Sequence, residues 1–494
     1  MTRVTVVGAG TAGLAAALAA SRAGADVTVL ERGERIGGTT ALSGGVAWLP
    51  ANDRTDDTPE QALAYLRALA LGDVVDELVE VFAREAGATA AWLERETPLR
   101  WQAIPYPDYH AELDGAREGG RALEPAAYDA PERIRDLIRD APNRSGSITY
   151  AELLAGGADD DELARRDAAG TLTAGKSLLG CLLEACLDAG VELRTGTRVT
   201  DLPEDGAVVL ATGGFDRDEQ LVRAFLRGPM LAPTGAPGLV GDGLRLAMGA
   251  GAALGAMSEA WWCPATRIPG ETIDGEPMFR LLLAERTRPR CLMVDGSGRR
   301  FVDEAQNYND LGRALLNFEP QSFAYPHVPA WLVFDAGYRR ASPLGPLAPD
   351  APDPDWLARA GSVAALAEAI GVPPVELEAT VDRFNEGAAR GEDPEHGRGS
   401  TAYDRFIGGL GPVDDGPYYA LRVLPGCLGT KGGPRTDAHG RVLSIVGGEP
   451  IPRLYAAGNA AASPLGLAYP GAGGTLGPAL VFGARAGRAA AEDA

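Results

Sequence analysis

Three hydrophobic runs at the start of the chain predict a strand, a helix and a second strand. Residues 4–7 are rich in valine, residues 14–23 are rich in alanine and leucine, and residues 27–30 again contain valine and leucine. Valine favours strands, whereas alanine and leucine favour helices. A strand, a helix and a strand within about 30 residues predict a βαβ unit, which begins a parallel sheet.

Further helices and strands are predicted by the hydrophobic pattern along the rest of the chain. Leucines such as Leu63, Leu66 and Leu78 recur at helical spacing and predict amphipathic helices within residues 55–100. Residues 101–147 are irregular and rich in proline, glycine and aromatic residues, a composition typical of a lid or of a wall of a binding site. We also expect helices at 178–187 and 244–254, strands at 191–194 and 207–210, and a charged surface segment at 155–170.

The composition changes near Ser258, where tryptophan, proline and arginine become frequent. Strands are expected at 290–295 and 330–334, helices at 363–370 and 375–384, and a final strand and helix at 454–459 and 476–491. The chain has 494 residues, more than the roughly 250–300 at which a single hydrophobic core stops growing. We therefore predict a first domain built from residues 1–258 and 427–494, with an inserted domain at residues 259–426.

The turn between the first predicted strand and helix has the glycine spacing of a dinucleotide-binding site. Gly8 permits a tight turn, Gly10 lets the backbone approach a pyrophosphate, and Gly13 lets the helix pack closely on the strand. The helix N-terminus supplies free N–H groups to the phosphates. Glu31 ends the second strand, where an acid accepts hydrogen bonds from ribose hydroxyls. The complete arrangement is much more specific than an isolated glycine-rich turn.

A second stretch of small and hydroxyl residues follows Glu31. It contains Gly37, Gly38, Thr39 and Thr40, and then Ser43, Gly44 and Gly45. A plain nicotinamide-binding domain has no need of these residues directly after the acid. Their backbone and hydroxyl donors are placed to reach a second face of the pyrophosphate and a flavin ring, which favours a flavin over an ordinary flexible loop.

Composition and charge exclude several other classes of protein. The net charge of −22 disfavours nucleic acid and anionic membranes as partners. No run approaches the ~18 apolar residues of a transmembrane helix, and the N-terminus lacks a signal-peptide layout, so we expect a cytoplasmic protein. The five cysteines and four histidines are scattered, which predicts reduced thiols and no metal site. The chemistry is therefore expected to come from a bound organic cofactor.

Taken together, these segments resemble the flavoprotein superfamily of fumarate reductase flavoproteins and 3-ketosteroid dehydrogenases. The resemblance extends along the whole chain and implies an α/β fold: a Rossmann-type FAD-binding domain with an inserted α+β substrate domain. It also implies non-covalent FAD, because covalently flavinylated members carry a histidine where residues 37–45 have none. The implied FAD-binding residues are Gly8, Gly10, Thr11, Ala12, Gly13, Glu31, Arg32, Gly38, Thr39, Thr40, Ser43, Gly44, Gly45, Val199, Ala211, Thr212, Gly213, Gly458, Asn459, Gly474 and Leu476.

Three further segments, residues 300–308, 428–433 and 469–474, are similar to the 3-ketosteroid 1-dehydrogenase group. This resemblance implies that Tyr308 removes a proton from the carbon next to a ketone, with assistance from Tyr109. Tyr469 and the backbone N–H of Gly473 would polarise the ketone oxygen. The implied substrate is an apolar cyclic ketone, with a steroid as the ring system of the family, and an electron acceptor is needed to complete the cycle.

The residue chemistry agrees with these roles. An enolate that forms beside a carbonyl requires preorganised donors, and a tyrosine hydroxyl with a main-chain N–H is a minimal oxyanion hole. A tyrosine base, with an ordinary pKa near ~10, needs help from its surroundings to act near neutral pH. The hydride from the adjacent carbon would pass to flavin N5.

Three alternatives remain at this stage. A soluble fumarate reductase-like enoate reductase would need an arginine proton donor and His/Arg pairs for two carboxylates, and neither His327 nor His439 lies in such a segment. A tailoring dehydrogenase or reductase would keep the tyrosines but act on a non-steroid cyclic ketone. A flavoprotein that only binds its cofactor would show no flavin bleaching when substrate is added anaerobically.

Overall fold

The protein is described here by a computed structural model that covers residues 2–72, 74–140 and 146–493. A six-stranded sheet forms its centre, in the order β17–β18–β7–β1–β2–β6. Every neighbouring pair from β18 to β6 is parallel, whereas β17 is antiparallel to β18. The strands are β1 (Arg3–Val7), β2 (Asp26–Leu30), β6 (Glu192–Arg194), β7 (Ala207–Leu210), β17 (Arg441–Leu443) and β18 (Pro450–Ala456).

Two helices from opposite ends of the chain pack together over this sheet. They are α1 (Thr11–Arg22) and α15 (Leu476–Glu492). A side chain at Gly487 would place its Cβ 2.0 Å from the carbonyl oxygen of Ala16, and one at Gly483 would place it 2.5 Å from that of Ala12. The small residues of both helices therefore allow their backbones to approach closely, which joins the two ends of the sequence into one layer.

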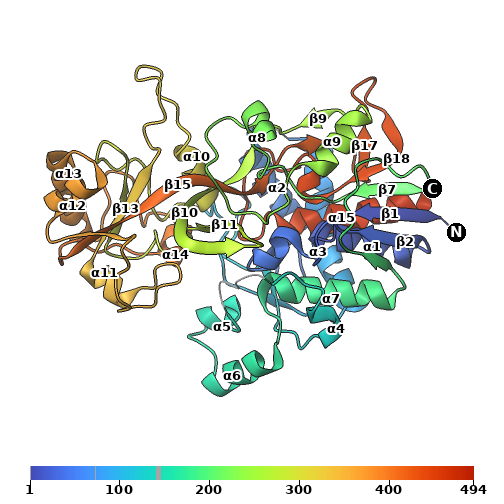
Figure 1. The fold of residues 1–494 in the computed structure, drawn as a ribbon, viewed down its shortest axis with the longest axis horizontal. Coiled ribbons are helices and arrows are strands. Elements are labelled where there is room, and N and C mark those ends of the chain that lie inside the picture. Colours follow the sequence, from blue (N-terminus) through green and yellow to red (C-terminus); the bar gives the residue numbers. More distant parts are fainter. Residues whose placement is uncertain (1, 73, 141–145, 494) are drawn as a thin grey trace.

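A second sheet, of seven strands, lies beside the first. Its path is β11–β10–β15–β13–β12, and β14 and β8 also pair with β15. Figure 1 shows α11, α12 and α13 at the end of the molecule opposite the two chain termini. The strands are β8 (Ala232–Pro233), β10 (Ala260–Ile273), β11 (Glu276–Leu281), β12 (Cys291–Val294), β13 (Ala330–Asp335), β14 (Ala358–Ala360) and β15 (Tyr418–Thr430). The helices are α10 (Tyr308–Ala314), α11 (Ala336–Ala341), α12 (Val363–Ile370), α13 (Pro374–Ala388) and α14 (Ala402–Ile407).

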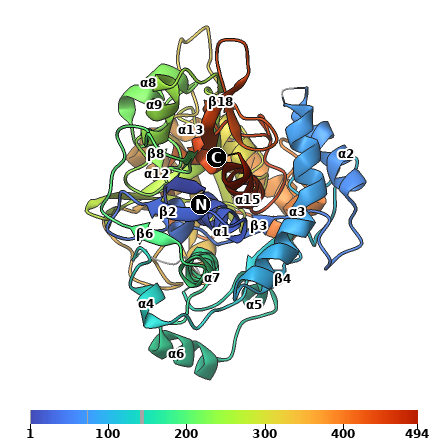
Figure 2. The same ribbon diagram turned by 90° about the vertical axis from the view of Figure 1, so that its right-hand side faces the viewer.

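Smaller elements surround the six-stranded sheet, as Figure 2 shows from the end that carries both termini. A three-stranded sheet is formed by β3 (Ala47–Trp48), β5 (Ala122–Pro125) and β4 (Trp101–Ala103), and a two-stranded sheet by β9 (Leu254–Gly255) and β16 (Gly433–Pro434). The α-helices are α2 (Pro59–Ala70), α3 (Asp76–Glu96), α4 (Glu132–Arg135), α5 (Tyr150–Leu154), α6 (Asp160–Ala169), α7 (Ala174–Asp188), α8 (Glu219–Phe225) and α9 (Asp242–Gly249). The 3₁₀ turns are η1 (Gly38–Leu42) and η2 (Gly458–Ala460).

The predicted fold class is confirmed, while several element bounds differ from the sequence prediction. The helix expected to reach residue 254 ends at Gly249, because Ala250 and Gly251 lead into strand β9. The strand expected at 454–459 ends at Ala456 and is followed by η2. The irregular stretch at 101–147 contributes β4 and β5 to a small sheet. The domain boundaries at 258/259 and 426/427 stay a prediction.

Candidate active site

A cavity of about 550 Å³ lies where the two large sheets meet, which is within the range of small-molecule sites. Val7 and Leu30, the last residues of β1 and β2, lie in its wall, so the cavity opens at the carboxyl ends of the parallel strands. Ligands of open α/β sheets bind at this edge. Residues of β11 and α10 form the opposite wall, and the N-terminal end of α15 closes it.

The three glycines of the first turn have different surroundings. Gly8 has φ +108°, and a Cβ there would lie 2.4 Å from the oxygen of Ala211. A Cβ at Gly13 would lie 1.9 Å from the oxygen of Gly8, so Gly13 allows the close packing of helix and strand. A Cβ at Gly10 would meet no atom within 4 Å. The space above Gly10 is thus open on the side of the cavity, which fits a pyrophosphate lying against its backbone.

Glu31 is held in position by the backbone on both of its carboxylate oxygens. The N–H of Ala9 donates to one oxygen at 2.9 Å and the N–H of Gly33 donates to the other at 2.8 Å. Glu31 also lines the cavity. The carboxylate is therefore fixed at the end of β2, where it can accept hydrogen bonds from ribose hydroxyls.

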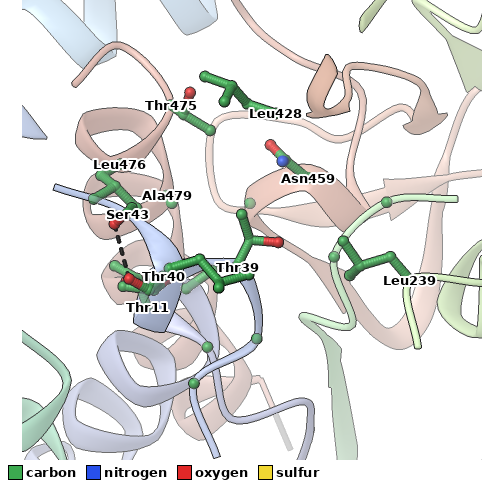
Figure 3. A pocket seen from close by; sticks show the side chains of 18 of the residues that line it. Thr11, Thr39, Thr40, Ser43, Leu239, Leu428, Asn459, Thr475, Leu476 and Ala479 are labelled. Carbon is green, nitrogen blue, oxygen red and sulfur yellow. Dashed lines mark hydrogen bonds between the residues drawn. The ribbon is translucent and has the colours of Figure 1, made fainter. Parts of the chain in front are cut away.

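Hydroxyl groups from the second small-residue stretch face the helix N-terminus of α1. The hydroxyls of Thr11 and Thr40 are 2.9 Å apart, and Ser43 donates to the carbonyl oxygen of Thr40 at 2.8 Å. Figure 3 shows Thr11, Thr39 and Thr40 on one side of the cavity and α15 beside them. Residues separated by hundreds of positions in sequence thus line a single space that fits FAD.

Nearly all of the predicted cofactor-binding residues line this cavity. The exceptions are Gly13, which packs on Gly8, and Gly474, whose α-carbon faces the Tyr469 ring so closely that a Cβ would lie 3.0 Å from it. The predicted residues in the wall are Gly8, Gly10, Thr11, Ala12, Glu31, Arg32, Gly38, Thr39, Thr40, Ser43, Gly44, Gly45, Val199, Ala211, Thr212, Gly213, Gly458, Asn459 and Leu476.

The predicted catalytic tyrosines come together on the same cavity wall. The ring centroids of Tyr109 and Tyr308 are 5.6 Å apart, those of Tyr308 and Tyr469 are 5.2 Å apart, and those of Tyr109 and Tyr469 are 5.4 Å apart. Tyr308 is the first residue of α10, whereas Tyr109 and Tyr469 lie in loops. All three are buried within the protein and line the cavity.

Burial changes the acidity of these phenols. Desolvation raises the pKa of Tyr308 well above its ordinary value, Tyr469 raises it further, and the contact with Tyr109 acts in the opposite direction. Desolvation also raises the pKa of Tyr109 and Tyr469, although the contact between Tyr469 and Thr475, at 3.0 Å between their hydroxyl oxygens, opposes the rise for Tyr469. The phenols are therefore protonated near neutral pH, so Tyr469 can donate a hydrogen bond.

Gly473 lines the same cavity. It has φ +92°, and a Cβ there would lie 2.5 Å from the oxygen of Val46, so a side chain does not fit. Its own carbonyl oxygen accepts from the N–H of Trp48 at 3.0 Å. No described residue accepts the N–H of Gly473, which leaves this donor available for a ligand next to Tyr469.

Several residues of the site are not apparent from the sequence. The ring of Tyr403 is 4.9 Å from that of Tyr109, and the ring of Tyr106 packs on Phe406 at 4.8 Å. Tyr403 is the second residue of the short helix α14 and belongs to no recognisable motif, so only the tertiary structure brings it to the cluster. Apolar side chains complete this wall: Ile104, Phe279, Leu281 and Leu283.

Lys431, from the motif at residues 428–433, is fully buried behind the tyrosines. Its ammonium donates to the carbonyl oxygens of Gly466 and Ala468 at 2.9 and 2.7 Å and lies 4.2 Å from the centre of the Trp261 ring. Burial lowers the pKa of Lys431 to about 7. This side chain therefore supports the segment that leads into Tyr469 rather than the cavity itself.

The described residues contain no cluster of acidic, histidine and cysteine side chains that would hold a metal ion. All five cysteines are buried, and no disulfide bond joins them. Across the described ranges, every helix is too short or too polar to cross a membrane.

Comparison with known proteins gives the class of this site. The model of the FAD binding domain family matches residues 3–476, which is nearly the whole chain. The chain therefore belongs to this family of FAD-binding flavoproteins, and the prediction of FAD as its cofactor is confirmed.

Individual relatives narrow the class. The chain is 38% identical to 4-oxocyclohexanecarboxylate 2-dehydrogenase of Sinomonas cyclohexanicum, over 99% of this chain and 93% of the relative. It is 35% identical to 3-oxosteroid 1-dehydrogenase of Mycobacterium tuberculosis, over 97% and 96% of the two chains. The crystal structure of 3-ketosteroid delta1-dehydrogenase from Sterolibacterium denitrificans, in complex with 1,4-androstadiene-3,17-dione, matches with a TM-score of 0.93 and 32% identity and covers 100% of both chains. The protein is an FAD-dependent dehydrogenase of the 3-ketosteroid 1-dehydrogenase type, which acts on CH–CH bonds.

Proposed function

We propose that this enzyme desaturates a cyclic ketone by removing a proton from the carbon next to the carbonyl group and a hydride from the carbon after it. The observation that carries the proposal is the meeting of Tyr308, Tyr469 and the free N–H of Gly473 on one wall of the FAD cavity. When bound, FAD supplies the hydride acceptor, at its N5 atom.

The carbonyl end of the substrate would be held by Tyr469 and Gly473. As the proton leaves the neighbouring carbon, negative charge develops on the ketone oxygen, and two fixed donors stabilise it. Because the pKa of Tyr469 is raised, this residue keeps its proton at neutral pH and can donate it in a hydrogen bond. Both donors are fixed before the reaction and need no rearrangement.

Tyr308 would act as the base. It is buried beside Tyr109, and the contact with Tyr109 lowers the pKa of Tyr308 and so favours its ionised form against the effect of burial. Tyr469 lies 5.2 Å from Tyr308 and 5.4 Å from Tyr109 between ring centroids, so a ring held at Tyr469 would have its neighbouring carbon close to Tyr308. Tyr109 thus supports the base rather than replacing it.

The charges around the cavity favour an uncharged ring as the substrate. In the described part of the chain, the wall contains no lysine, and a carboxylate partner compensates each of its arginines. These pairs are Arg32 with Asp242, Arg139 with Asp274, and Arg280 with Glu271. A carboxylate on the substrate would therefore find no uncompensated arginine in this wall, whereas the apolar side chains near the tyrosines suit a hydrocarbon ring system such as a 3-ketosteroid.

A comparison of two ketone types tests this proposal. We expect a 3-ketosteroid to support turnover with an artificial electron acceptor, and 4-oxocyclohexanecarboxylate to be a poorer substrate at neutral pH. Turnover of the carboxylated monocyclic ketone alone would favour the second candidate, a dehydrogenase of non-steroid keto acids, which the 38% identity to such an enzyme supports. Failure of every cyclic ketone to react would contradict the proposal.

FAD is expected to be bound tightly but without a covalent bond. Acid precipitation should release yellow FAD into the supernatant, because no histidine lies within residues 37–45. Gly10→Val should abolish FAD binding and leave the fold intact, since its side chain would enter open space that the pyrophosphate needs. Gly361→Val is the matched control, because a Cβ at this exposed glycine also meets no atom within 4 Å. Flavin that stays with the pellet, or a Gly10→Val protein that keeps its FAD, would contradict these expectations.

The rate of flavin reduction should rise with pH. A tyrosine whose pKa is raised is protonated at neutral pH, and the fraction of the ionised base increases about tenfold per pH unit below its pKa. We therefore expect kcat/KM to increase between about pH 7 and 9 without a plateau. The measurement is the dependence of kcat/KM on pH at low ketone concentration, and a rate that falls over this range would contradict a tyrosine base.

A further inference from the structure

Asp108, the residue before Tyr109, lies at the centre of a buried hydrogen-bond network. One of its carboxylate oxygens accepts from the indole N–H of Trp48 at 2.7 Å. The other accepts from the Arg121 guanidinium at 2.7 Å and from the backbone N–H of Arg117 at 3.0 Å. Asp57 binds the same guanidinium on its other side, at 2.7 and 2.8 Å. The side chain of Asp108 therefore helps to fix the loop that carries Tyr109.

Trp48 connects this network to the turn that carries the carbonyl donors. Its backbone N–H donates to the carbonyl oxygen of Gly473 at 3.0 Å. Its ring lies so close to Gly471 that a Cβ there would be 2.6 Å from the indole, and 3.3 Å from the carboxylate of Asp108. A single residue of β3 thus contacts both the loop of Tyr109 and the turn of Gly473.

The same two segments also meet directly. The backbone N–H of Tyr109 donates to the carbonyl oxygen of Pro470 at 3.0 Å, and the hydroxyl of Tyr65 donates to this oxygen at 2.7 Å. Pro470 follows Tyr469 in sequence. These hydrogen bonds join the loop of Tyr109 to the turn of Tyr469 and Gly473. The side chains of Trp48 and Asp108 form a further link between the same two segments.

We propose that Trp48 and Asp108 are positioning residues that hold the loop of Tyr109 at a fixed distance from the turn of Tyr469 and Gly473. Neither residue lines the cavity, so both act through the residues they hold. The inference rests on the proposed function, in which Tyr109 supports the base Tyr308 while Tyr469 and Gly473 hold the neighbouring carbonyl group of the same ring. A displacement of about 1 Å between such groups costs on the order of 10²-fold in rate.

The decisive variant is Trp48→Phe, which keeps an aromatic ring and removes the indole N–H. Trp101→Phe is its matched control. Trp101 lies in β4, in the same three-stranded sheet as Trp48, and is also buried, but its indole N–H has no hydrogen-bond partner among the described residues. Both variants lose the same volume, and only Trp48→Phe breaks the connection to Asp108.

The first measurement is hydrogen–deuterium exchange of the FAD-loaded protein, which needs no substrate. In Trp48→Phe we expect amide exchange to increase by about tenfold in residues 104–113 and 466–474 together, with no such change in Trp101→Phe. Asp108→Asn removes the anion and keeps Trp48, and it should increase amide exchange in the same two segments. It replaces Trp48→Phe in this test if that variant does not fold. Equal behaviour of the two tryptophan variants, or loosening of one segment alone, would overturn the proposal.

The second measurement is anaerobic flavin reduction by a ketone that carries deuterium next to its carbonyl group. Trp48→Phe should lower the maximal rate by about 10–10²-fold, alter KM little and increase the deuterium isotope effect, because proton removal becomes the slow step. A smaller folded fraction would lower the amplitude of bleaching and leave the rate constant and the isotope effect unchanged, and that result would overturn the proposal. If wild-type protein reacts with no ketone, the proposed function fails, whereas the exchange measurement still decides whether Trp48 and Asp108 join the two segments.

Discussion

Tyr308→Phe is expected to keep its fold and its FAD and to lose most of its turnover. The phenylalanine ring preserves the contacts with Tyr109 and Tyr469, whose ring centroids lie 5.6 and 5.2 Å away, but it has no hydroxyl to accept a proton. General base catalysis contributes roughly 10²–10⁴-fold, so the rate should fall by this amount. The measurement is steady-state turnover of a 3-ketosteroid with an artificial electron acceptor.

Tyr338→Phe provides the control for loss of a buried phenol. Tyr338, in helix α11, is buried, and its hydroxyl donates to the carbonyl oxygen of Glu285 at 2.8 Å. It does not line the cavity. Its replacement should cost about 1 kcal/mol of stability and leave turnover unchanged. Near-normal turnover in Tyr308→Phe would remove the proposed base and leave only an FAD enzyme of unknown mechanism.

Tyr469→Phe is the second variant with a large expected effect. Its hydroxyl lies 3.0 Å from that of Thr475, and Tyr469 and Gly473 both line the cavity. Loss of one donor to a developing oxyanion costs roughly 10²–10³-fold, while Gly473 would still supply the other donor. Flavin-reduction rates at saturating ketone measure this effect, and an unchanged maximal rate with a higher KM would indicate that Tyr469 only binds the substrate.

The two tyrosines should not act independently. If both stabilise the same enolate-forming step, the loss in the double variant is smaller than the product of the two single losses. Tyr109→Phe should have a milder effect, because Tyr109 supports the base through a hydrogen bond. Fully multiplicative losses for Tyr308→Phe and Tyr469→Phe would place the two residues in separate steps.

The cofactor half of the site could be predicted from sequence because its determinants are local. Gly8, Gly10 and Gly13 lie within one turn, and Glu31 ends the adjacent strand, so spacing alone predicts their arrangement. The structure also shows that these glycines have different surroundings. Gly10 faces open space, whereas Gly13 contacts only the protein. Gly474 lies close to the predicted position but outside the cavity wall, because the turn directs it against the ring of Tyr469.

The substrate side was less accessible to sequence reasoning because it depends on contacts between distant residues. The long strands β10 and β15 pair across more than a hundred positions, and their composition, with prolines at 264 and 425, does not resemble that of regular strands. Tyr403 joins the tyrosine cluster only through this tertiary arrangement. The connection between Trp48 and Asp108 spans 60 positions and leaves no local pattern.

Anaerobic flavin reduction by a 3-ketosteroid is the most direct test of the central claim, that a tyrosine removes the proton next to the carbonyl group as the flavin is reduced. The flavin of the wild-type protein should be bleached in a single turnover, and more slowly when the ketone carries deuterium at that carbon. In Tyr308→Phe the flavin should be bleached at least about 10²-fold more slowly. The claim would be contradicted if no ketone bleached the wild-type flavin, or if Tyr308→Phe bleached as fast as the wild type.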